Sequence, residues 1–212
     1  MRSACNGERK IILEEKTLKV YFIRHGQSEG NRQRYYCGWS AAPLSELGHQ
    51  QARNANAYLK DIPFDRIYCS DLLRARQTCE DALPGSQPIL SDKIREVDVG
   101  SLSGKLYDEC AATLDEAYIR SERLQDFSLY GGESQQQMHA RVQSFIHELE
   151  QLEGVEHVAV FGHEGTVHQM INYVFGHDVA LQHLRIANAS ATVFSYENGV
   201  WTLLAFSYTG TL

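Results

Sequence analysis

The sequence predicts an α/β fold in which helices cover both faces of a mostly parallel sheet. Short apolar runs rich in β-branched and aromatic residues alternate with longer amphipathic stretches. This alternation is typical of βαβ units, which build parallel sheets. The segments 191–197 and 200–207 instead flank Asn198-Gly199, a dipeptide that favours a type I′ hairpin. We therefore expect a three-layer α/β/α architecture that ends in an antiparallel pair of strands.

The size and charge of the chain indicate one domain without a general affinity for nucleic acid. Its 212 residues, 43% hydrophobic and 22% charged, are ordinary for a single α/β unit. Residues 1–16 lack periodicity and are expected to form a tail or an extra edge element, which leaves 17–212 as the domain. The formal net charge of -7 means that an anionic ligand would need a locally basic pocket.

The sequence favours a cytoplasmic protein that does not enter a membrane. The stretch from Met1 to Lys19 is polar and mixed in charge, unlike a signal peptide, and no run approaches the ~20 apolar residues of a membrane span. Five cysteines form no C-x-x-C pair and leave an odd one over. Reduced thiols are therefore expected in preference to a disulfide framework.

The first half of the chain is expected to begin with a buried strand at Leu18–Ile23. A long polar and aromatic loop follows over 25–43, and Ser45 then caps a helix to about Lys60. The positions of that helix expected to face inward are Leu47, Ala55, Tyr58 and Leu59. A second strand is expected at 66–69 and a helix at 71–82, before Pro84 and Gly85 interrupt the pattern.

The second half is expected to contain a short strand near 89–90 and one helix over 105–123. Ser134 is a candidate N-cap for the helix with the clearest period in the chain. Its apolar positions, at i, i+4, i+7, i+11 and i+14, are Met138, Val142, Phe145, Leu149 and Leu152. A strand at 157–161 and a helix to about Phe175 complete the βαβ pattern.

Polar residues follow two of these apolar runs at the point where each run stops. Arg24-His25-Gly26 comes after the first strand, and Gly162-His163 comes after the strand at 157–161. Open α/β sheets bind ligands at the carboxyl ends of their strands. Arginine supplies a planar charged fork that matches phosphate oxygens, and histidine can be a neutral nucleophile near pH 7. We therefore expect both histidines at one edge of the sheet, and we assign no function to the other seven.

Five ordered segments resemble those of the histidine phosphatase superfamily, also called the phosphoglycerate-mutase-like family. The segments are Arg24–Gly26, Ser70–Thr78, Arg95–Gly100, Gly132–Ser134 and Gly162–Gly165. A lone Arg-His-Gly occurs often by chance, whereas five segments in the same order do not. The resemblance runs from about Leu18 to the C-terminal hairpin. It implies the phosphoglycerate mutase-like α/β/α fold and a histidine-phosphatase catalytic domain.

The resemblance implies that His25 attacks phosphorus and becomes a phosphohistidine. One ring nitrogen must then carry a lone pair while the other keeps a bonded hydrogen. The groups implied to bind the phosphate oxygens are Arg24, Asn31, Arg74 and His163. Arg74 could instead be a surface charge, but a position in the first turn of its helix favours the pocket. Arg76 is two positions further on and is expected to be structural.

The resemblance also implies that Glu96 is the general acid and base. It would protonate the leaving oxygen and later activate water, a role that contributes on the order of 10²–10⁴-fold. The alternative is an exposed carboxylate that pairs with Arg95, and Asp98 is a second candidate for the acid. Glu133-Ser134 is expected to organise a loop and cap a helix.

The sequence departs from the family at two places. Ala42-Pro43-Leu44 lacks the acidic residue that often precedes Pro-Leu, so the anchoring of that loop is open. Glu164 stands where small residues are common, and a carboxylate beside an anion site would repel phosphate unless it turns away.

Other phosphatase and metal chemistries fail on spacing. His163-Glu164 to His168 has one residue too many for H-E-x-x-H, and Gly100 to Lys105 is one short of a P-loop. No cysteine fits Cys-x5-Arg, and there is no Asp-x-Asp motif. We therefore expect a metal-independent histidine acid phosphatase-type hydrolase that uses no cofactor and works in the presence of a chelator.

The substrate is expected to be a small phosphorylated metabolite, such as a sugar phosphate or nucleotide. A basic and aromatic cluster in the loop after His25 could contact it, or could equally be packed against itself: Arg32, Arg34, Tyr35, Tyr36 and Trp39. A phosphatase ranks above a phosphoglycerate mutase because only 36 residues separate Glu96 from Glu133, where family mutases usually carry a longer insertion. A non-catalytic phospholigand-binding protein ranks third. The sequence leaves the oligomeric state open.

Overall fold

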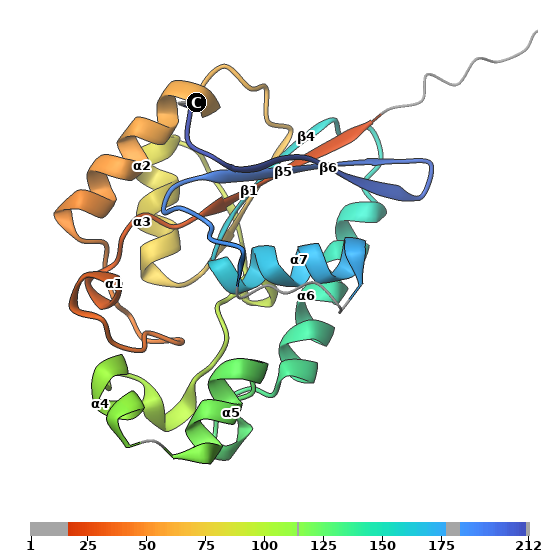
Figure 1. The fold of residues 1–212 in the computed structure, drawn as a ribbon. Coiled ribbons are helices and arrows are strands. Elements are labelled where there is room, and N and C mark those ends of the chain that lie inside the picture. The colour runs from red at the N-terminus through yellow and green to blue at the C-terminus, as the bar shows by residue number, and fades with distance from the viewer. Residues whose placement is uncertain (1–16, 114, 177–182, 211–212) are drawn as a thin grey trace, which may run out of the picture.

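The computed structural model describes residues 17–113, 115–176 and 183–210. Its centre is a six-stranded sheet in the order β3-β2-β4-β1-β5-β6 (Figure 1). The strands are β1 (Leu18–Arg24), β2 (Arg66–Ser70), β3 (Ile89–Ser91), β4 (His157–Gly162), β5 (Ala191–Glu197) and β6 (Val200–Tyr208). Strands β1 to β4 are parallel to one another. Strand β5 is antiparallel to β1, and β6 is antiparallel to β5. The predicted fold class is confirmed.

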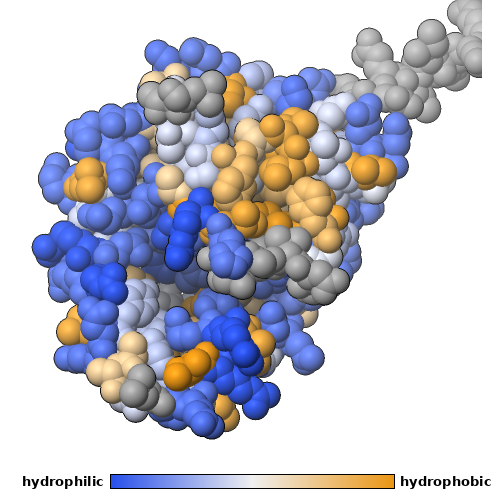
Figure 2. All heavy atoms as spheres, viewed as in Figure 1, coloured by the Kyte–Doolittle hydropathy of each residue, from blue (hydrophilic) through white to orange (hydrophobic). Residues whose placement is uncertain are grey.

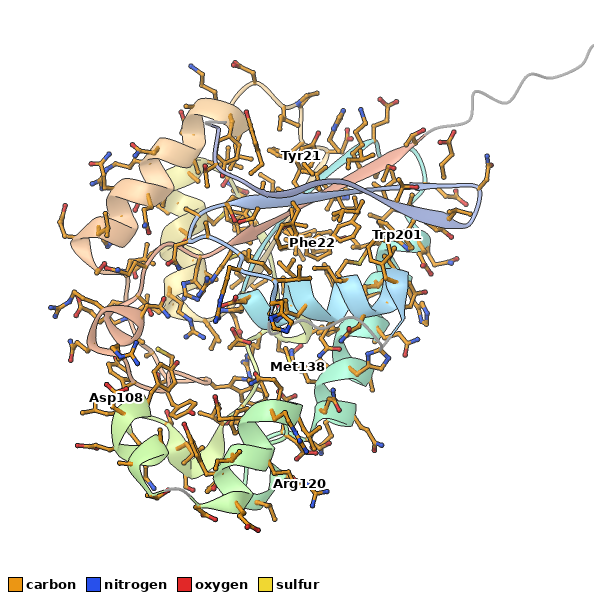
Figure 3. All side chains as sticks on the ribbon, viewed as in Figure 1. Tyr21, Phe22, Asp108, Arg120, Met138 and Trp201 are labelled. Carbon is orange, nitrogen blue, oxygen red and sulfur yellow. The ribbon has the colours of Figure 1, made fainter. Side chains whose placement is uncertain are left out.

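Two helices lie on each face of the sheet. Helices α2 (Glu46–Leu59) and α3 (Leu73–Ala82) cover one face, and α6 (Gln135–Glu150) and α7 (Glu164–Phe175) cover the other (Figure 1). Because side chains of a strand alternate between faces, Phe22 belongs to the core under α6 and α7, whereas Tyr21 packs on the opposite core (Figure 3).

Short helical segments form a smaller group beside the main body, next to the carboxyl ends of the parallel strands (Figure 1). They are α1 (Glu29–Gln33), α4 (Tyr107–Ala112), α5 (Glu116–Leu124) and the 3₁₀ turns Asp92–Ile94, Gly100–Leu102 and Ser128–Tyr130. The loop expected over 25–43 therefore contains a capped helical turn. The single helix expected over 105–123 was wrong, because Asp115 accepts a hydrogen bond from the Ala117 amide (3.0 Å) and starts a second helix.

Several local predictions are confirmed. Asn198 (φ 52°) and Gly199 (φ 80°) both have positive φ, as a type I′ turn requires. The periodic face of α6 is buried. Leu47 was assigned to the wrong side of α2: its side chain is exposed, because the buried face contains Gly48, Ala52, Ala55 and Leu59.

The structure bears on three further expectations, about the N-terminal residues, the cysteines and a membrane span. Residues 1–16, including Cys5, lie outside the described part of the chain. Within that part, Cys37, Cys69, Cys79 and Cys110 are free thiols. None of the described helices combines the length and the apolar character that crossing a bilayer requires.

Candidate active site

The two predicted histidines meet at the carboxyl edge of the sheet. Strands β1 and β4 are neighbours in register, with Arg24 opposite Gly162, so His25 and His163 follow the paired ends together. The His25 amide donates to the Gly162 carbonyl (3.0 Å), and the imidazole centroids are 5.2 Å apart. Figure 2 shows a hydrophilic hollow between the main body and helices α4 and α5. The expected juxtaposition is present.

Hydrogen bonding fixes the tautomer of His25. Its Nδ1 lies 2.7 Å from the Gly26 carbonyl oxygen. A carbonyl can only accept, so Nδ1 carries the hydrogen and Nε2 keeps a lone pair. The carbonyl of His25 itself accepts from the side-chain amide of Asn188 (3.0 Å). The ring is thus held with one nitrogen available as a nucleophile.

Both imidazoles are kept neutral by their surroundings. Burial lowers the pKa of His25 well below 6.5, and the positive charges of Arg74 and Arg24 lower that pKa further. Burial also lowers the pKa of His163, again helped by Arg74. A neutral His25 retains the lone pair that attack on phosphorus needs.

Ser70 orients His163. This serine ends β2, the strand beside β4, and its Oγ lies 2.9 Å from Nε2 of His163. The Nδ1 of His163 is buried without a partner among the described residues. A hydroxyl that donates to Nε2 leaves the hydrogen on Nδ1, where a ligand oxygen could accept it. The sequence argument used Ser70 only as the start of a helix and missed this contact.

Arg74 lies inside the molecule, in the first turn of α3. Arg74 is 1% exposed, and its guanidinium donates to the carbonyls of Gly38 (2.9 Å) and Ser40 (3.4 Å). The Thr78 hydroxyl donates to the Arg74 carbonyl (2.7 Å) and accepts from the Gly26 amide (3.0 Å), which ties α3 to the loop after His25. The surface alternative for Arg74 was wrong. Arg76, which was expected to be structural, is exposed.

Arg24 is shared between two protein groups. Its Nη2 lies 3.1 Å from the Glu164 carboxylate, and its Nη1 donates to the Ile186 carbonyl. Its Nε is buried without a partner among the described residues. Glu164 therefore turns toward the arginine. A guanidinium has five N–H groups, so a phosphate could still be bound.

Asn31 takes part in the cap of α1. Its Oδ1 accepts from the amide and the hydroxyl of Ser28, both at 3.1 Å. The donor that could reach a phosphate is its Nδ2.

The loop that follows is held by Pro43 and Leu44, because the Glu29 amide donates to the Pro43 carbonyl (2.9 Å) and the Leu44 amide donates to the side-chain oxygen of Gln77 (2.8 Å). These bonds answer how the loop is anchored without an acidic residue.

Glu96 lies against the start of α7. Its Oε1 accepts from the Val97 amide (3.0 Å) and occupies the space where a side chain on Gly165 would begin. Only Glu164 separates Gly165 from His163 in the chain, so the carboxylate lies against the helix start that follows the second imidazole. The alternative pairing with Arg95 is not present, because Arg95 pairs with Asp71. Glu96 is therefore turned toward Gly165 and is not paired with Arg95.

Asp98 and Glu133 have structural partners. Asp98 Oδ1 accepts from the amide of Gly100 (2.9 Å), the first residue of the turn Gly100–Leu102. Glu133 accepts from the Asp98 amide (3.0 Å) and pairs with Arg141 through both oxygens, at 2.9 and 2.7 Å. Ser134 caps α6 as expected.

Sequence reasoning missed Arg141, which holds the main chain that carries Glu96. Its Nη1 donates to the carbonyls of Lys93 and Arg95, both at 3.0 Å, and its Nη2 donates to the Glu96 carbonyl (3.3 Å). The same carbonyl accepts from the indole of Trp39 (2.7 Å). The arginine is on α6, 45 residues after the acid, so only the packing of α6 brings the two together.

The basic and aromatic loop does not present one common surface. Tyr36 is buried, with its hydroxyl 2.7 Å from that of Tyr118. Arg32 pairs with Glu29, and Arg34 pairs with Asp108. The packed alternative therefore holds for Tyr36, whereas Arg32 and Arg34 are exposed and paired with carboxylates, and Trp39 is exposed beside Glu96.

The described residues include no group of three or more histidine, cysteine, aspartate or glutamate side chains arranged to hold a metal ion. The positive charge of the site comes from arginine.

Comparison with known proteins agrees with the geometry. Residues 20–209 match the model of the histidine phosphatase superfamily (branch 1). A probable phosphoglycerate mutase of an Enterobacter species is 29% identical over 190 residues, 87% of each chain. The adenosylcobalamin/alpha-ribazole phosphatase of Salmonella typhimurium is 28% identical over 191 residues, 88% of this chain and 90% of that protein.

The fold also matches solved structures. A mycobacterial glucosyl-3-phosphoglycerate phosphatase, solved with vanadate, superposes with a TM-score of 0.80 at 26% identity, over 90% of this chain and 99% of that one. The family match covers nearly the whole described chain and contains all five motif segments. The chain belongs to the histidine phosphatase superfamily, branch 1.

Proposed function

We propose that the protein is a phosphomonoesterase that hydrolyses a small phosphorylated metabolite through a phosphohistidine on His25. The observation that carries the proposal is the pair of buried, neutral imidazoles 5.2 Å apart, with Nε2 of His25 free of a hydrogen and two arginines close enough to lower its pKa. Attack on a phosphate dianion needs a nucleophilic lone pair and surrounding positive charge, and His25 and the arginines supply them.

The proposed first step transfers the phosphoryl group to the enzyme. Arg24, Arg74 and Nδ1–H of His163 bind the non-bridging oxygens, and the Asn31 amide adds a neutral donor. Nε2 of His25 forms a bond to phosphorus while the ester P–O bond breaks. A protonated Glu96 gives its proton to the departing oxygen, so an alcohol leaves.

The second step returns the enzyme to its starting state. Glu96, now a carboxylate, takes a proton from water as the water oxygen attacks phosphorus. The N–P bond breaks and inorganic phosphate leaves. Arginine and imidazole neutralise the developing charge, so the proposed cycle needs neither a metal ion nor a cofactor.

Hydrolysis is favoured over transfer to a second acceptor. In the described part of the 36 residues between Glu96 and Glu133, the helical segments are short: α4, α5 and the two 3₁₀ turns Gly100–Leu102 and Ser128–Tyr130. The names of the relatives also support small phosphorylated substrates, namely alpha-ribazole phosphate and glucosyl-3-phosphoglycerate. A phosphoglycerate mutase activity is the second candidate because several relatives carry that name. Action in the cytoplasm, away from nucleic acid and membranes, remains part of the proposal.

The test is phosphate release from p-nitrophenyl phosphate and from alkyl phosphates, with a chelator present. His25→Ala should abolish release, whereas the exposed His147→Ala should not. Loss of activity on chelation that metal restores would contradict the metal-independent mechanism. Transfer of phosphate to 3-phosphoglycerate in preference to water would favour the mutase. Binding of phosphate esters without turnover would favour a non-catalytic protein.

A further inference from the structure

Glu164 places a negative charge beside the phosphate-binding residues. It follows His163 directly and begins α7. Its carboxylate lies 3.1 Å from Nη2 of Arg24, and its side chain is 27% exposed while that of Arg24 is 15% exposed. The carboxylate is therefore the more exposed partner of the pair and lies beside an arginine that the proposed mechanism assigns to the phosphate, so a bound ester would come close to it.

The other arginines near the site are also committed to protein partners. Arg95 pairs with Asp71 through both ends of its guanidinium, and Arg141 pairs with Glu133 in the same way. Arg74 donates to main-chain carbonyls from a buried position, and its charge helps to lower the pKa of His25. The arginines of the loop after His25 have carboxylate partners as well: Arg32 with Glu29 and Arg34 with Asp108. None of these pairs offers a ready cation to a second anionic group of a substrate.

A substrate with a second anion would instead approach the carboxylate of Glu164, whose side chain is 27% exposed beside Arg24. Like charges repel where partial burial limits screening by solvent. A hydroxyl group meets no such penalty, because it can donate a hydrogen bond to the carboxylate. Glu164 therefore favours one class of ester over another.

We propose that Glu164 restricts the substrate to phosphomonoesters whose leaving group carries no second anion close to the phosphate, and favours hydroxylated, uncharged leaving groups. The proposal rests on the proposed function, since it concerns the same phosphate site. Glu164 is a specificity-determining residue here, because it acts on the charge of the part of the substrate that does not react.

Glycerol 3-phosphate and 3-phosphoglycerate form a matched pair of probes. Glycerol 3-phosphate carries a hydroxymethyl group where 3-phosphoglycerate carries a carboxylate. Their dissociation constants are measured by calorimetry on the His25→Ala background, where no ester is consumed. Glu164→Gln is compared with Glu164→Asp, which keeps the charge. Glu197→Gln is the matched control: it removes one charge at an exposed position at the far end of β5, next to the start of β1.

With Glu164 present, glycerol 3-phosphate should bind at least about tenfold more tightly than 3-phosphoglycerate. Glu164→Gln should reduce that ratio by about tenfold, whereas Glu164→Asp and Glu197→Gln should leave it within about threefold. The same ratios are then measured as kcat/KM in the protein with His25 intact.

An unchanged ratio in Glu164→Gln would overturn the proposal. Tighter binding of 3-phosphoglycerate by the starting protein would also overturn it, and loss of that binding in Arg185→Gln would identify the exposed arginine before Ile186 as the cation responsible. Absence of a phosphohistidine on His25 would overturn the proposed function instead, and the binding ratios would still be measurable.

Discussion

Replacement of Arg141 by methionine should slow the hydrolysis of esters with poor leaving groups far more than that of esters with good ones. Among the described residues, Arg141 makes no hydrogen bond to the proposed nucleophile or to the proposed phosphate-binding groups, although its charge contributes to lowering the pKa of His163. Its guanidinium instead fixes the carbonyls of Lys93, Arg95 and Glu96. Without it, the main chain that carries the acid loses three hydrogen bonds and the carboxylate loses its position.

The magnitude follows from these contacts. Glu133, with a side chain 12% exposed, would lose both bonds to the arginine. Loss of one partner of a buried pair costs about 3–5 kcal/mol, so about 2–4 kcal/mol is expected for this slightly exposed pair. For catalysis, a displacement of about 1 Å costs on the order of 100-fold. We therefore expect kcat/KM for an alkyl phosphate to fall by about 100-fold.

The assay compares glycerol 3-phosphate with p-nitrophenyl phosphate in the stopped-flow. The p-nitrophenolate anion leaves without protonation, so its first turnover should change by no more than about threefold. Steady-state turnover of p-nitrophenyl phosphate by the variant should be slow, because activation of water still needs Glu96. A burst of p-nitrophenolate should therefore precede the steady state. Arg141→Met with Glu133→Gln is the control: it removes the unpaired carboxylate and should recover stability in urea without recovering activity on the alkyl ester.

Equal loss of activity on both esters would refute this reasoning, since it would mean that the variant damages the phosphate site as a whole. A variant that is less stable but hydrolyses the alkyl ester normally would also refute it, because Glu96 would then keep its position without Arg141.

Three further predictions concern the same edge of the sheet. Gly165→Ala should displace the Glu96 carboxylate, since the added methyl group would overlap it, and should lower alkyl phosphate turnover by about 10- to 100-fold in steady-state assays. Ser70→Ala should lower kcat by about tenfold and alter the pH profile, because His163 loses the bond that sets its tautomer. The depressed pKa of His25 should keep the rate of the first step high below pH 6.5. The free energy of unfolding in urea should be full above pH 6.5 and fall as the pH drops below it, because His25 then binds a proton in the unfolded chain but not in the folded one. His25→Ala should flatten that pH dependence.

Much of the site followed from one rule about strand ends. His25 and His163 were expected together because each follows an apolar run, and the parallel pairing of β1 with β4 provides the physical reason. The same rule extends to Ser70 at the end of β2, but a serine before a helix is more often a cap, and the sequence alone could not decide between the two.

The contacts that sequence could not supply depend on tertiary packing. Arg141 looks like an ordinary helix charge, and only the packing of α6 near the turn at Asp92–Ile94 brings it to Glu96. Leu47 was assigned inward from its hydrophobicity, whereas α2 buries small residues that allow the helix to lie close: a side chain on Gly48 would overlap the main chain of Gln27. Local patterns do not reveal such close approaches.

The most direct test of the account is the site of covalent phosphate. The protein is mixed with p-nitrophenyl phosphate, quenched, and mapped by mass spectrometry for acid-labile, base-stable phosphate. We expect phosphate on His25, at Nε2 because Nδ1 is bonded to the Gly26 carbonyl, with more of it in Glu96→Gln and none in His25→Ala. Turnover without phosphate on His25, or phosphate on another residue, would contradict the account.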